Sequence, residues 1–193
     1  MSNILKIPES LQFYFENEQH VSAINQIIES DSLPIGLTWE EVEQYNVAKI
    51  SALSTQLDYW RLMKELWSAT WGKALASSEY KEVDPDFYDD EYSMEFVWDD
   101  SFYKAYEYKG NTIYFYCWSP ENTDIQLGFC VESPDGQNDI SNSLELSDGW
   151  TEAVDDDRRT QNGLIDIKGK TEIDIEPLIK LVEEVVLKLR TNI

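Results

Sequence analysis

Three residues in the second half of the chain have the types and spacing that metal-dependent hydrolysis of a phosphodiester requires. Asp135 follows Pro134 in the turn-prone stretch "SPDGQND", and Asp166 and Lys168 follow in "LIDIKGK". Because side chains alternate along a strand, Asp166 and Lys168 are expected side by side on one strand face. In such a site the two carboxylates hold a metal ion and the lysine assists the attacking water.

This arrangement is similar to the motif of the PD-(D/E)xK nucleases, which have an acid in a turn and then an acid and a lysine on a strand. The resemblance implies a metal-dependent nuclease that uses Asp135, Asp166 and Lys168. The motif is short, however, and alternating polar strands reproduce it freely. A nuclease must also approach phosphates, which this acidic chain would repel. The nuclease is therefore kept as an alternative, and no catalytic residue is predicted.

A second candidate for metal chemistry is "DPDFYDDEYSMEFVWDD", residues 84–100, which has eight carboxylates and no basic residue. Read as an EF-hand loop, it has Asp84 and Asp86 at the first and third ligand positions and Glu95 at the twelfth. The fifth position is Tyr88, and the position that needs a glycine for the sharp turn is Asp89. We therefore predict no metal site here, and no cofactor.

The same segment also has many aromatic residues, which a disordered acidic tail would lack. Tyr and Trp dominate the energetics of protein interfaces, and surrounding carboxylates favour a partner rich in Lys and Arg. The segment is therefore predicted to bind a basic protein. The predicted contact residues are Asp84, Asp86, Tyr88, Asp89, Asp90, Glu91, Tyr92, Glu95, Trp98, Asp99 and Asp100.

Composition supports this interpretation. The chain has 38 acidic residues against 15 Lys and Arg, a net charge of −23. The excess runs through both halves, with 20 acids and 6 bases in residues 1–100 and 18 acids and 9 bases in residues 101–193. Such a field repels nucleic acids and anionic membranes and attracts basic proteins. Direct contact with nucleic acid or membrane is therefore not expected.

Other chemical sites and targeting signals receive little support. His20 is the only histidine and is expected to be a surface or packing residue. Cys117 and Cys130, the only cysteines, lie in apolar runs and are expected to be buried free thiols. The start "MSNILKIPES" lacks the apolar run of a secretory signal, and no segment has the length of a membrane span. The expected location is the cytoplasm.

The first part of the chain has a helical pattern. Residues 18–30 have apolar residues at helical spacing, whereas "LQFYF" (11–15) fits a strand or the start of a helix. Thr38 and Glu41 form a capping box, the start signal of a helix expected to reach about residue 76. The apolar stripe that follows, on one long helix or on two helices in series, is predicted to be a buried core face, with a coiled-coil or aromatic docking stripe as the alternative. It comprises Ile50, Leu53, Leu57, Trp60, Trp67 and Trp71.

From residue 102 the apolar period changes to two, which predicts strands. "FYKAYEY" and "NTIYFYCW" flank "KGN" as a hairpin, and "IQLGFCVE" and "LIDIKGKTEIDIE" give further strands. Pro177 fits the first turn of a closing helix. The predicted fold is a single α+β domain: N-terminal helices packed on an antiparallel sheet of about four to six strands, closed by a C-terminal helix. Its parts are a helical front (1–80), an acidic connector (81–101), a β-rich part (102–175) and the C-terminal helix (176–191).

Taken together, these features predict a non-enzymatic acidic binding or inhibitor protein. Its partner would be a basic, nucleic-acid-handling protein such as a nuclease or a toxin, because carboxylates on a rigid body can imitate the charge of DNA. In composition, though not in motif, the chain resembles immunity proteins and DNA mimics. A structural or accessory interaction protein without mimicry is the second alternative, beside the nuclease.

Overall fold

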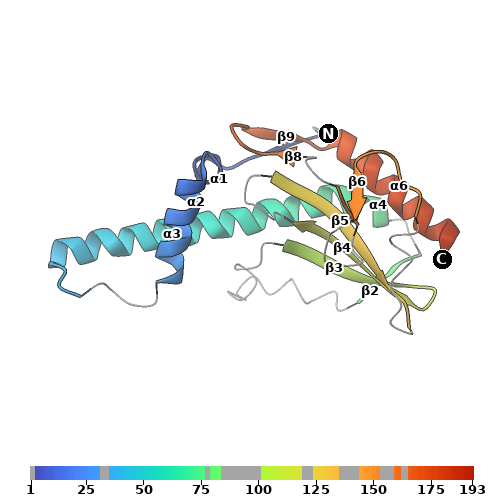
Figure 1. Ribbon diagram of the computed structural model, residues 1–193, viewed down its shortest axis with the longest axis horizontal. Helices are drawn as coiled ribbons and strands as arrows, with labels where there is room; N and C mark the ends of the chain where they lie inside the picture. Colours follow the sequence, from blue (N-terminus) through green and yellow to red (C-terminus); the bar gives the residue numbers. More distant parts are fainter. Residues whose placement is uncertain are drawn as a thin grey trace.

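The computed structural model describes residues 3–30, 35–76, 79–83, 101–118, 124–134, 144–152, 159–161 and 165–193. One long helix, α3 (Trp39–Trp67), runs along the molecule, and the sheet lies beside its second half only (Figure 1). The first half of α3 projects beyond the sheet, with α2 (Glu18–Glu29) lying across it. The molecule therefore has a packed body and a helical projection.

Local signals explain where the helices begin. The Asn17 side chain accepts hydrogen bonds from the backbone N–H groups of Gln19 and His20 and so caps α2. The predicted capping box of α3 is confirmed: Glu41 N–H donates to Thr38 Oγ1 and Thr38 N–H donates to Glu41 Oε2. At 1.5 Å per residue, the 29 residues of α3 extend for about 43 Å.

The helix continues beyond α3 through a π-helical turn, η1 (Ser68–Gly72), into α4 (Lys73–Leu75). The predicted end near residue 76 is therefore confirmed. Before α2, residues 9–14 form α1, which decides the ambiguous "LQFYF" stretch as helix. Among the described residues, no helix is long and apolar enough to cross a lipid bilayer.

All strand pairs of the described residues are antiparallel. The predicted hairpin is confirmed, and its turn at Lys109 and Gly110 has the positive φ angles of 48° and 84° that such tight turns need. Two-residue β8 (Ile165–Asp166) pairs with the start of β5, and β1 (Ile4–Lys6) pairs separately with β9 (Glu172–Asp174). The spatial order of the main sheet is β2 (Lys81–Val83), β3 (Ser101–Tyr108), β4 (Asn111–Trp118), β5 (Asp124–Glu132), β7 (Arg159–Gln161) and β6 (Trp150–Glu152).

Two tryptophans, one in α3 and one in η1, donate hydrogen bonds to the backbone of the sheet. The Trp67 Nε1–H donates to the Phe115 carbonyl at 2.7 Å, and the Trp71 Nε1–H donates to the Tyr116 carbonyl at 3.2 Å. Both indole rings are buried, and the Trp71 ring packs against Phe115 and Phe129. Each donor therefore keeps a hydrogen-bond partner while its ring fills the core.

The closing helix is α6 (Glu176–Asn192), with Pro177 in its first turn as predicted. It packs against η1 and α4, and its buried residues include Val182, Val185 and Leu189. One hydrophobic cluster contains residues of α1, α3, the sheet and α6. The predicted α+β class with a C-terminal helix is confirmed.

The predicted core stripe of α3 is correct only in part. Trp60, Trp67 and Trp71 are buried, but Ile50 is 68% exposed. The reason is the length of the helix: the sheet covers its second half, so an apolar residue in the projecting half has no sheet to meet (Figure 1).

Candidate functional site

The predicted site residues lie mostly outside the part of the chain that the structure describes. This holds for Asp84, Asp86, Tyr88, Asp89, Asp90, Glu91, Tyr92, Glu95, Trp98, Asp99 and Asp100, and for Asp135. Their role therefore stays a prediction.

The predicted strand placement of Lys168 is wrong. Strand β8 ends at Asp166, and Lys168 lies exposed in a turn together with Gly169. The turn is closed by a hydrogen bond from the Lys170 N–H to the Ile167 carbonyl, and it uses the positive φ of 70° at Gly169. Alternation along a strand therefore does not place Lys168 beside Asp166, because the strand ends between them. Within the described ranges, no three His, Cys, Asp or Glu side chains form a group that could hold a metal ion.

The clearest surface feature is the projecting half of α3 together with α2. We call α2 and residues 35–54 the acidic arm. The chain has no Lys or Arg between Lys6 and Lys49. The acidic arm consequently has five carboxylates and one cation, Lys49. Its acidic residues are Glu18, Glu29, Glu40, Glu41 and Glu43.

The single cation of the acidic arm is turned inward. Lys49 Nζ donates to the Ser30 carbonyl at the end of α2. Beside it, Tyr45 Oη donates to Ser30 Oγ at 2.8 Å. These two bonds hold the end of α2 against α3. They also leave the opposite, outer face of residues 39–54 of α3 without a positive charge.

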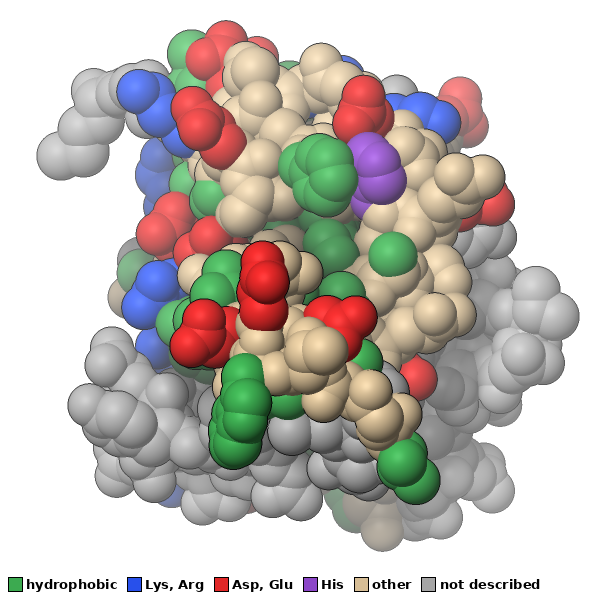
Figure 2. All heavy atoms as spheres, turned by 90° about the vertical axis from the view of Figure 1, so that its left-hand side faces the viewer, with side chains coloured by type: hydrophobic (Ala, Val, Ile, Leu, Met, Phe, Trp, Pro, Cys, Tyr) green, Lys and Arg blue, Asp and Glu red, His purple; other side chains and the backbone are tan. Residues whose placement is uncertain are grey.

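Three large apolar side chains are exposed on that outer face. Trp39 is 87% exposed, Val47 64% and Ile50 68%. With 3.6 residues per turn, these three and the exposed Glu43 fall within an arc of about 80° around the helix. Figure 2 looks onto this end of the molecule, where acidic and apolar side chains lie next to each other and the cations lie toward the edges of the view. Apolar residues gathered in this way are typical of interaction surfaces.

The capping box places the first of these residues. The Thr38 side chain accepts a hydrogen bond from the Glu41 N–H, and the Thr38 N–H donates one to the Glu41 carboxylate, so the helix begins at Trp39. The Trp39 indole therefore lies on the first turn. The same bonds from the backbone and hydroxyl of Thr38 lower the pKa of Glu41. A negative charge at a helix N-terminus is favourable, because the helix dipole is positive there. The end of the acidic arm is therefore both ordered and anionic.

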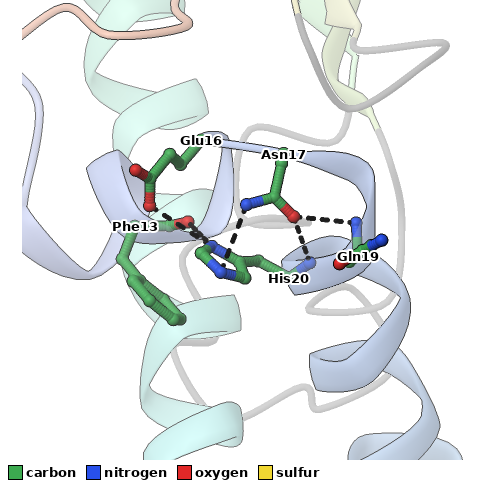
Figure 3. Close-up of polar contacts among 5 residues, drawn as sticks. All are labelled: Phe13, Glu16, Asn17, Gln19 and His20. Carbon is green, nitrogen blue, oxygen red and sulfur yellow. Dashed lines mark hydrogen bonds and ion pairs between the residues drawn. The ribbon is translucent and has the colours of Figure 1, made fainter.

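The single histidine joins α1 to α2 (Figure 3). The His20 ring stacks on Phe13 with centroids 3.9 Å apart, and its Nδ1 lies 2.8 Å from the Phe13 carbonyl and 3.5 Å from Glu16. Asn17 Oδ1 already caps the helix, so its Nδ2 faces His20 Nε2 at 3.2 Å as donor. Assigned from this network, the neutral ring has its hydrogen on Nδ1 and donates it to Phe13. His20 is therefore a packing residue, as predicted.

The two cysteines differ. Cys117 faces the helices and is fully buried, which raises the pKa of its thiol well above the usual value. Cys130 is only half-buried, so its predicted burial is wrong. The reason is the period of two: in β5 the odd-numbered residues face the core, and Cys130 lies on the other face. A neutral buried thiol is a poor nucleophile, which excludes Cys117 from that role.

From the sequence, "WEEVE" (39–43) was an acidic cluster that could extend the field of residues 84–100, but the whole arm was not predicted, although the run without Lys or Arg was a readable signal. Sequence reasoning also missed a half-buried pair, in which Lys104 binds Glu82 beside the Trp67 ring. Comparison of the chain with models of protein families, with curated proteins and with solved structures found no match. The functional argument consequently depends on the geometry of this chain alone.

Proposed function

We propose that the protein is a non-enzymatic binding protein whose acidic surface docks on a basic, nucleic-acid-handling protein such as a nuclease or a toxin. One observation supports this most: the acidic arm projects from the body with five carboxylates, and its one lysine, Lys49, binds the end of α2. Among the described residues of the arm, the five carboxylates therefore have no cation beside exposed Trp39, Val47 and Ile50. Carboxylates without a neighbouring cation suit a basic partner, whose Lys and Arg they attract.

Charge and apolar contact would act at different stages of binding. At physiological salt the screening length is about 8 Å, so the carboxylates guide a partner only over short distances and raise the association rate. Exposed Trp39, Val47 and Ile50 would then hold the partner through burial of apolar area. In this proposal the carboxylates of residues 84–100 form a second contact.

The proposal includes a cytoplasmic location. Its support is that Cys117 and Cys130 are free thiols in a chain with no other cysteine, which suits a reducing compartment. The nuclease alternative is not carried forward, because Lys168 lies in a turn and not on the strand that the motif requires.

The proposal is tested by affinity capture from native lysate at low and high salt, read by mass spectrometry. Three forms are compared: wild type, a variant with Asp86, Asp89, Asp90 and Glu91 changed to Asn or Gln, and an arm variant Glu40→Gln/Glu43→Gln. The matched control for the arm variant is Glu172→Gln/Glu183→Gln, which removes two exposed carboxylates elsewhere.

A basic nucleic-acid enzyme should be retained at low salt, released at high salt and weakened by at least one of the two charge variants, but not by the control. Equal loss in the control would mean that total charge alone matters. If the amount of captured partner changes neither with salt nor with any variant, a structural or accessory role is favoured instead.

A further inference from the structure

We infer that the outer face of the first half of α3, formed by Trp39, Glu40, Glu43, Val47 and Ile50, is a docking seam for a cationic amphipathic helix of the partner protein. This inference rests on the proposed function and names the surface and the kind of segment that fits it. Below, these five residues are called the seam.

The first argument is exposure. Trp39, Val47 and Ile50 are large apolar residues, and each leaves well over half of its surface in water. On the opposite side of the same helix Ala52, Thr55 and Tyr59 are buried. The helix is therefore apolar on two sides, and the body of the protein accounts for only one of them. An amphipathic helix needs one apolar side, so the second indicates a further contact.

The second argument is spacing. From Trp39 the seam steps by four residues to Glu43, by four to Val47 and by three to Ile50. The same row continues by steps of four and three through exposed Ser54 to half-buried Leu57. These steps average 3.6 residues, the period of the α-helix, so the residues form one continuous row along which the ridges of a second helix can pack. A second helix therefore fits this face better than a strand or a loop does.

The third argument is charge. Glu43 lies within the seam and Glu40 at its edge, whereas the only Lys or Arg between Trp39 and Trp60 is Lys49, which binds the end of α2. The next cation along this face is Arg61, and its guanidinium lies 3.7 Å from Asp58. A matching helix would therefore need Lys or Arg beside its apolar row.

The charge also argues against a second copy of this chain. Two seams packed on one another would bring Glu40 and Glu43 of both chains together without a cation on the seam. Each chain has a net charge of −23, so repulsion between the copies adds to that local penalty. The first half of α3 projects beyond the described strands of the sheet (Figure 1).

The test uses the full chain and a defined probe. The probe is a dye-labelled synthetic helix of about 20 residues, long enough to be helical, with Leu at the seam positions and Lys beside them. A second peptide has Glu in place of each Lys. Affinity is measured by fluorescence anisotropy at about 50 mM and about 200 mM salt, because charge contacts weaken over this range. Sedimentation of the protein alone reports whether it forms dimers.

Two variants remove apolar contact without changing charge. Ile50→Gln and Trp39→Ala should each weaken binding of the cationic peptide about tenfold or more, the loss typical of a central contact residue. The matched control is Leu187→Gln on α6, because Leu187 is 61% exposed and lies far from the seam in sequence. It should leave the affinity unchanged. Circular dichroism checks that each variant is folded, and Ile50→Gln keeps the test valid if Trp39→Ala disturbs the first turn.

Three results would overturn the inference: equal effects of Ile50→Gln and Leu187→Gln, equal binding of the anionic peptide, or a dimer that Ile50→Gln dissociates. Affinity capture from native lysate, repeated with the two seam variants, distinguishes failure of this inference from failure of the proposed function. A basic partner that both seam variants retain would leave the proposed function standing and overturn the seam. Capture of no basic partner by any form would overturn the proposed function itself.

Discussion

Strand β5 contains a glycine whose replacement should be strongly destabilising. Gly128 lies opposite Tyr116 on β4, and the Tyr116 ring occupies the space that a side chain at Gly128 would need. A Cβ atom at Gly128 would stand 2.2 Å from Tyr116 Cε2 and 2.3 Å from Cζ. Carbon atoms in ordinary contact are about 3.5 Å apart, so the ring would have to move by more than about 1 Å. Tyr116 is only 5% exposed, which limits that movement.

The size of the effect follows from two opposing contributions. Overpacking of this kind typically destabilises by about 1–3 kcal/mol. Alanine offsets part of this loss, because a glycine inside a strand is less favourable than alanine by roughly 0.5–1 kcal/mol. The two contributions combine to a net loss between about 0 and 2.5 kcal/mol, and the severe 2.2 Å contact places it near the upper end. Gly128→Ala should therefore lower the free energy of unfolding by about 2 kcal/mol, and the melting temperature by about 4–8 °C for a chain of this size.

Urea unfolding measures this change as a lower midpoint at unchanged slope. The double variant Tyr116→Ala/Gly128→Ala tests the cause, since removal of the ring removes the clash. Tyr116→Ala should then be less harmful in the Gly128→Ala background than in wild type, with a coupling energy above about 0.5 kcal/mol. A neutral Gly128→Ala, or two effects that simply add, would refute the reasoning.

Three further predictions concern the start of α3 and the thiols. Thr38→Ala removes the cap acceptor of Glu41 N–H, so amides in the first turn of α3 should exchange about fivefold faster while global stability changes little, as hydrogen exchange would report. Because the pKa of Glu41 is lowered in the folded state, the capping box stabilises above the unfolded pKa and loses this effect as pH falls through the lowered value; an NMR titration should show it, and Glu41→Gln should abolish it. Because burial raises the pKa of the Cys117 thiol, a thiol reagent should label half-buried Cys130 in the native protein and Cys117 only on unfolding. Equal labelling rates would contradict the burial of Cys117.

Features that depend on near neighbours in the chain were predictable. The Thr38–Glu41 capping box, the hairpin around Lys109 and Gly110, and Pro177 in the first turn of α6 each involve residues a few positions apart. The α+β class follows from the change of apolar period near residue 102. In each case the local backbone preference and the tertiary fold agree, so the pattern is sufficient.

Features that depend on distant partners were not predictable. Residues 4–6 pair with residues 172–174, and neither segment alone indicates the other. The pattern of "LIDIKGK" predicted Lys168 on a strand, but β8 ends after pairing with only two residues of β5. How far a short strand continues is decided by the neighbour that accepts its hydrogen bonds, which the pattern does not contain.

The sequence by itself determined the charge, the elements of the fold and the apolar face that each element offers. It could not tell which apolar residues would meet another surface. Ile50 and Trp60 belong to one stripe, yet Ile50 is exposed and Trp60 is buried. The sheet lies beside only the second half of α3, so only the tertiary structure separates core from candidate interface. Whether a residue is buried depends on which other element packs against it, and the apolar period of a single helix does not contain that information.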